Sequence, residues 1–134
     1  MTIDTLIMKI ITGKAPCVVG LDIGGGELPE CFSRADVSEN VRLFNRTVID
    51  AVCELVPAIS VNIPALLPYG VSVIRDTFLY AKEKELFVIA DAKCSGDPAA
   101  SFAEAEFYFD TLGADCVTVS PYFGAAGLTP FFEK

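Results

Sequence analysis

Short apolar runs alternate with longer amphipathic segments along the chain. Four runs have the length and β-branched content of strands that are covered on both faces: residues 17–21, 58–63, 86–90 and 116–120. The segments between them repeat apolar side chains at spacings of three and four, which predicts helices. Strands that alternate with helices predict right-handed β/α units and one parallel sheet.

Five helices follow from this pattern, at residues 1–12, 37–56, 69–84, 98–112 and from 128 onward. Asp36, with Glu39 three residues later, forms a capping-box pattern before the second helix. Asp97 is the predicted N-cap of the fourth helix, Pro98 takes its first position, and Gly113 follows its end. Four β/α units are about half of an eight-stranded barrel, so we expect an α/β half barrel in a single domain, residues 1–134.

The composition indicates a folded protein with an excess of apolar surface. Hydrophobic residues make up 52% and charged residues 21% of the 134 positions, which argues against disorder. The mean hydropathy of +0.48 is high, yet no apolar run approaches the roughly 18–20 residues of a membrane span. A half barrel would leave two edge strands and one sheet face uncovered, so we expect the isolated chain to self-associate or to be poorly behaved in solution.

Charge and cysteine content exclude several classes of function. A net charge of −8 argues against binding to nucleic acid or to an anionic membrane, although one phosphate could bind in a local pocket. The chain has no histidine, and its five cysteines form no CxxC pair, which argues against a zinc site or a histidine-dependent nucleophile. The odd cysteine count and the lack of a signal peptide predict a cytoplasmic location.

Polar residues stand where the predicted strands end, namely Asp22, Asn62, Asp91 with Lys93, and Ser120. Reactive groups of parallel sheets gather at these carboxyl ends. Asp91 and Lys93 are two residues apart, and alternate side chains of a strand point the same way. Each would stabilise the charged form of the other, leaving a positioned ammonium as proton donor. The alternative is an ion pair at the rim of the sheet.

Six segments carry motifs in a fixed order: residues 18–22, 44–51, 55–58, 69–70, 88–93 and 113–122. They extend over nearly the whole chain and resemble the bacterial orotidine-5'-phosphate decarboxylase family. The resemblance implies the N-terminal half of a TIM-type (β/α)8 barrel. It also implies a lyase that converts orotidine monophosphate to UMP in pyrimidine biosynthesis, without a cofactor or a metal.

The resemblance assigns roles to individual residues. The family uses a Lys-Asp-Lys-Asp array at a dimer interface. Its middle Asp, here Asp91, crowds the substrate carboxylate, and Lys93 protonates the carbon that loses carbon dioxide. Asp97 matches the last Asp, which the family takes from the neighbouring subunit. The alternative is that Asp97 serves only as the N-cap of the helix that follows it.

Substrate contacts are expected at Asp22, Asn62 and Thr118. The expected partner, besides the nucleotide substrate, is a second copy of the chain or a missing C-terminal half.

Three features depart from the family pattern. Ser60 occupies the position of the first lysine of the array. The family pattern Asp-Ala-Lys-Arg-Gly-Asp has gained one residue between Asp91 and Asp97. The late strands that carry the family's phosphate site are absent from these residues. These departures leave two alternatives open: an inactive truncated paralogue with a binding or structural role, and a sugar-phosphate lyase or isomerase that reuses Asp91 and Lys93.

Two further patterns favour purely structural roles. The Gly24-Gly25-Gly26 run follows a strand but lacks the GxGxxG spacing of a dinucleotide site, so we expect a flexible loop. Glu104, Glu106 and Asp110 fall on the fourth helix, where we expect a solvated face.

Overall fold

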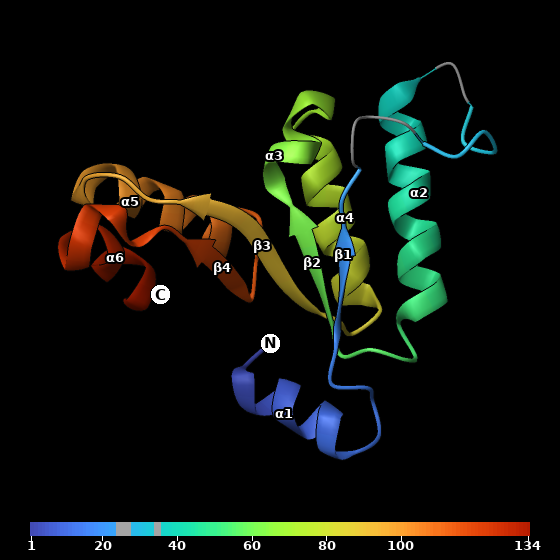
Figure 1. The fold of residues 1–134 in the computed structure, drawn as a ribbon, viewed down its shortest axis with the longest axis horizontal. Helices are drawn as coiled ribbons and strands as arrows, with labels where there is room; N and C mark the ends of the chain where they lie inside the picture. The colour runs from blue at the N-terminus through green and yellow to red at the C-terminus, as the bar shows by residue number, and fades with distance from the viewer. Residues whose placement is uncertain (24–27, 34–35) are drawn as a thin grey trace.

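The computed structural model describes residues 1–23, 28–33 and 36–134, so the Gly24–Gly26 run lies outside the described residues. Four parallel strands form one sheet in sequence order: β1 (Val18–Leu21), β2 (Ala58–Asn62), β3 (Phe87–Cys94) and β4 (Cys116–Val119). The helices around the sheet (Figure 1) are α1 (Ile3–Ile11), α2 (Val37–Val52), α3 (Ile63–Leu66), α4 (Val71–Glu83), α5 (Pro98–Ala105) and α6 (Gly124–Phe132). The α/β class and the parallel order are confirmed.

The element boundaries differ from the predicted ones at a few informative places. Asp36 caps α2 through the N–H groups of Ser38 and Glu39, as predicted. β2 ends at Asn62 because the Asn62 side chain accepts a hydrogen bond from the Ala65 N–H and starts the short helix α3. The predicted fourth helix consists of two parts, α5 and a π-helical segment, Glu106–Thr111, that follows it directly.

The main core lies between one face of the sheet and helices α2 and α4, which stand on the same side of β1 and β2 in Figure 1. Ile59, Val61 and Val88 are fully buried on that face. Alternate side chains of a strand point to opposite faces, so the half-buried Ser60 and Asn62 belong to the other face. That second face is the inner surface on which polar residues collect.

Considerable apolar surface remains exposed. Within the described part of the chain, β1 and β4 each pair with a strand on one side only. Helix α1 has no buried residue, and large apolar side chains are exposed on it and elsewhere, among them Ile3, Ile7, Ile11, Val18 and Phe132. No helix among the described residues is long and apolar enough to cross a membrane.

We expect the 134-residue polypeptide to self-associate when produced alone, because exposed strand edges and apolar patches favour association. Sedimentation velocity should show species heavier than the 14.4 kDa chain, increasing with concentration. Val18→Lys places a charge on the β1 edge and should shift the distribution toward the monomer. Val37→Lys, at a similarly exposed valine on α2, should not. A monodisperse wild-type monomer that unfolds cooperatively would contradict the expectation.

Candidate active site at the strand ends

Strand β3 bulges where its apolar run gives way to polar residues. Residues 91–93 of β3 stand opposite the single β4 residue Thr118, between the regular pairs Ala90–Val117 and Cys94–Val119. Lys93 has a φ of +49°, in the left-handed region that non-glycine residues seldom adopt. A bulge bends its strand and redirects side chains. Here it redirects the residues that the sequence marked as candidates.

Asp91 and Lys93 meet in this bulge, as predicted. The Lys93 Nζ lies 2.5 Å from Asp91 Oδ2, and the Thr118 hydroxyl donates to Asp91 Oδ1 at 2.8 Å. The hydrogen bond from Lys93, helped by the one from Thr118 and opposed by burial, lowers the pKa of the Asp91 carboxyl. The Lys93 side chain is 68% exposed and that of Asp91 22%. The ammonium is therefore accessible to a ligand, and the carboxylate stays charged at neutral pH.

The remaining strand-end residues lie along the same edge of the sheet. Asn62 pairs with Asp91 in the β2–β3 register, although its Oδ1 is engaged with the Ala65 N–H at 3.2 Å. Asp22 is exposed and follows β1 directly. Ser60 lies two residues before Asn62 and is paired with Gly20 and Ile89. Three adjacent strands thus bring Asp22, Asn62 and Asp91 to one edge.

Asp97 is the N-cap residue of α5. Its Oδ1 accepts hydrogen bonds from the Ala99 and Ala100 N–H groups, both at 3.0 Å, so the predicted helix cap is confirmed. The lengthened loop before it is held by Ser101. The buried Ser101 hydroxyl accepts from the Gly96 N–H at 3.0 Å and contacts the Gly96 carbonyl at 3.3 Å. The loop is fixed to α5, and Asp97 makes no ion pair with Lys93.

Three partly buried polar side chains, those of Cys94, Glu104 and Tyr108, lie close together next to the bulge. Burial, reinforced by the Glu104 carboxylate, raises the pKa of the Cys94 thiol to about 12, so this cysteine remains a neutral thiol. Burial also raises the pKa of Tyr108 to about 12. The prediction of a solvated face is wrong for Glu104, because α5 turns this residue toward Cys94 and buries its Oε2. It holds for Glu106 and Asp110, which are exposed.

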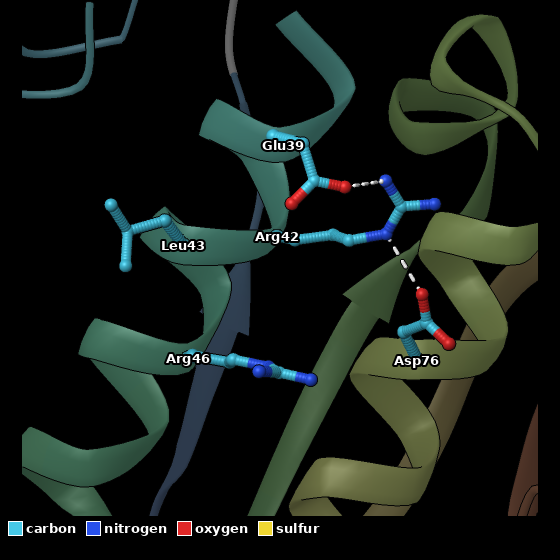
Figure 2. Close-up of a pocket in the computed structure, with 5 residues that line it drawn as sticks. All are labelled: Glu39, Arg42, Leu43, Arg46 and Asp76. Atoms are coloured by element: carbon cyan, nitrogen blue, oxygen red, sulfur yellow. Dashed lines mark hydrogen bonds and ion pairs between the residues drawn. The ribbon is translucent and has the colours of Figure 1, made fainter. Parts of the chain in front are cut away.

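An open groove of about 450 Å³ lies between α2 and α4 (Figure 2) and is lined by Glu39, Arg42, Leu43, Arg46 and Asp76. The Arg42 guanidinium bonds Asp76 at 2.8 Å, Glu39 at 2.6 Å and the Ser72 hydroxyl at 2.9 Å. These bonds join α2 to α4 and occupy the Arg42 guanidinium, while the Arg46 guanidinium lies over the Tyr80 ring, 5.0 Å from its centroid. Over the described residues, no cluster of acidic and cysteine side chains could hold a metal ion.

Two features of the site could not be read from the sequence. The bulge depends on how β4 pairs with β3, and no residue in the run from Ala90 to Cys94 marks it. The sequence predicts Thr118 only as a substrate contact. Its hydrogen bonds to Asp91 and to the Lys93 N–H, the latter at 3.0 Å, appear only in three dimensions.

Comparison with known proteins gives a consistent set of relatives, although no protein-family model matches the chain. The chain is 38% identical over 135 residues to an orotidine 5'-phosphate decarboxylase of Thermomicrobium roseum, covering 97% of this chain and 46% of that protein. It is 31% identical over 138 residues to the enzyme of the same name from Christiangramia forsetii, covering 99% and 50%. The chain spans about half the length of these relatives.

The fold has the same relatives. The structure of Leishmania donovani OMP decarboxylase superposes with a TM-score of 0.81 at 21% identity, over 99% of this chain and 50% of that one. At this level of identity the superposition establishes the fold. The four parallel β/α units correspond to half of the TIM-type barrel of these proteins, as predicted.

We expect Lys93→Gly to be more stable than Lys93→Ala by about 1 kcal/mol, because glycine adopts a positive φ without the steric cost of a Cβ. Both variants lose the ion pair with Asp91, so their difference reports the backbone alone. At the exposed Arg75, in the middle of α4, glycine should instead be less stable than alanine by about 1 kcal/mol. Urea denaturation at one fixed protein concentration measures both differences. Finding alanine equal or better at position 93 would contradict the left-handed backbone.

Proposed function

We propose that this chain supplies two groups, the Asp91 carboxylate and the Lys93 ammonium as proton donor, to a site that converts orotidine monophosphate to UMP. The chain belongs to the orotidine 5'-phosphate decarboxylase family and spans about half the length of its curated relatives. The reaction would serve pyrimidine biosynthesis. The observation that carries the proposal is the Asp91–Lys93 pair, held in a bulge at the carboxyl ends of the strands.

In the proposed reaction, the bond between the pyrimidine ring and its carboxylate breaks and carbon dioxide leaves. The electron pair of that bond stays on the ring carbon, and the Lys93 ammonium transfers a proton to it. Asp91 would stand close to the substrate carboxylate, so that their repulsion is relieved as carbon dioxide departs. The exposed ammonium of Lys93 and the low pKa of Asp91 support these two roles.

Asp22 and Asn62 are proposed as substrate contacts, because both stand at the same edge as Asp91. Asp97 is proposed to act toward the site of a partner subunit. Its cap uses Oδ1 for both bonds, and Oδ2 has no hydrogen bond to any residue in the described ranges. One carboxylate could therefore cap α5 and still offer an oxygen to a neighbouring molecule.

The proposed site is incomplete within the part of the chain that the structure describes. We propose that residues 1–134 form a single domain that works in the cytoplasm, either as a homodimer or together with a C-terminal half. The one-sided pairing of β1 and β4 supports a need for further strands, and the five free thiols agree with a reducing compartment.

The second candidate function is non-catalytic: the chain would be an inactive paralogue that acts as a binding or structural protein. Ser60 favours it, because a neutral side chain stands where the family array has a lysine. The loop from Cys94 to Asp97 also favours it, because it is one residue longer than the family pattern and is fastened to α5.

Release of carbon dioxide from orotidine monophosphate tests the proposed function. The chain should be assayed alone and with a polypeptide that supplies the uncovered half of the Thermomicrobium roseum relative. We expect turnover in the completed form, reduced at least about a hundredfold by Lys93→Ala, since a positioned general acid contributes about 10²–10⁴ in rate. Lys84→Ala, which removes a lysine paired with Asp50 on the outer surface, should leave turnover unchanged. No turnover in any form would favour the inactive relative.

We further expect Ser60→Lys to tighten UMP binding roughly tenfold or more, because it adds a cation on the inner face, two residues before Asn62. A charge-assisted hydrogen bond contributes about 1.5–3 kcal/mol. Thr47→Lys adds the same charge at an exposed position of α2 and serves as the control. Titration calorimetry measures both affinities. Equal affinities in the two variants would place Ser60 away from the nucleotide.

A further inference from the structure

The β-bulge leaves the backbone of Lys93 without its regular partner on β4. Regular pairing stops at Ala90 and resumes at Cys94, and the left-handed φ of Lys93 turns its N–H out of the strand ladder. A backbone N–H that loses its ladder partner needs another acceptor. The Thr118 hydroxyl fills that need, with its Oγ1 3.0 Å from the Lys93 nitrogen.

The same hydroxyl also holds the acid. Thr118 Oγ1 donates its single proton to Asp91 Oδ1 at 2.8 Å. Asp91 Oδ2 accepts a hydrogen bond from the Lys93 ammonium at 2.5 Å. A hydroxyl has one proton and two acceptor positions. The proton and one acceptor position are therefore committed within the chain. Asp91, Lys93 and Thr118 form a closed ring of hydrogen bonds that passes through both the backbone and the side chain of Lys93.

We propose that Thr118 is a positioning residue, which fixes the left-handed backbone of Lys93 and the orientation of the Asp91 carboxylate through one hydroxyl group. This role replaces direct substrate binding as the main task of Thr118. The consequence for catalysis rests on the proposed function, whereas the positioning itself does not. The competing explanation is that Thr118 only fills space on β4, where a side chain of the same shape would serve equally well.

The variant Thr118→Val keeps the shape and removes the hydroxyl, and Thr118→Ser keeps the hydroxyl. Two measurements by NMR follow the ring directly: hydrogen exchange of the Lys93 amide, and titration of the Asp91 side-chain carboxyl carbon. With Thr118→Val we expect the Lys93 amide to exchange about tenfold faster, as for the loss of one hydrogen bond of about 1.4 kcal/mol. The pKa of Asp91 should rise, because a hydrogen bond to the charged form is lost.

Thr118→Ser should keep both values near those of the wild type. Thr111→Val, at an exposed threonine that ends the π-helical segment, is the matched control and should also change neither. The proposal is overturned if Thr118→Val leaves the amide exchange and the Asp91 titration unchanged, or if Thr118→Ser alters them as strongly as valine would. The serine variant decides the matter even if the valine variant fails to fold.

These readouts need no turnover, so they separate the positioning role from the proposed reaction. If the NMR effects occur and no carbon dioxide is released, the ring stands and the decarboxylase function fails. If the completed protein is active, Thr118→Val should lower kcat more than it raises KM, and serine should restore kcat. A change in KM alone, with the NMR signals unmoved, would return Thr118 to the role of a substrate contact.

Discussion

The candidate site depends on one hydrogen-bonded junction between β3 and β4, where the Thr118 hydroxyl bonds both the Lys93 N–H and the Asp91 carboxylate. Without an acceptor there, the left-handed backbone of Lys93 would leave an N–H group unpaired. Backbone strain of this kind persists when surrounding contacts determine the conformation. The junction therefore links a strained backbone to the ion pair that gives the site its chemistry.

The sheet explains why this junction lies at an open edge. Ile59, Val61 and Val88 pack on the helices α2 and α4, and the opposite face carries the polar strand-end residues together with apolar ones such as Ile89. That face has no covering layer within the described residues, and the strands β1 and β4 have free edges. A complete barrel would enclose this face, lower the local dielectric constant and strengthen the interaction between Asp91 and Lys93. We expect the Lys93 side chain, which is 68% exposed here, to be less exposed in a complete barrel.

The sequence predicted the features that depend on neighbouring residues, namely the strands and the helix caps. The strands are apolar and β-branched, and Asp36 and Asp97 cap α2 and α5 as their spacing indicates. It could not predict features that depend on contacts between distant segments. The bulge arises from the pairing of β3 with Thr118, and the burial of Glu104 arises from the approach of α5 to Cys94. Asp91 and Lys93 were expected to meet through simple alternation along a strand, and they meet through an irregularity instead.

Charge balance limits what the described residues could do without a partner. A nucleotide monophosphate that also carries a carboxylate brings several negative charges to the site, and like charges repel strongly where water is excluded. Against them this chain places Lys93 at the strand ends, together with the acids Asp22 and Asp91. Ser60 and Cys94 are neutral, the latter because burial keeps its thiol protonated. Barrels of this type bind phosphate in their late loops. For the proposed reaction to proceed, the cations that hold the anion must therefore come from outside the residues that the structure describes.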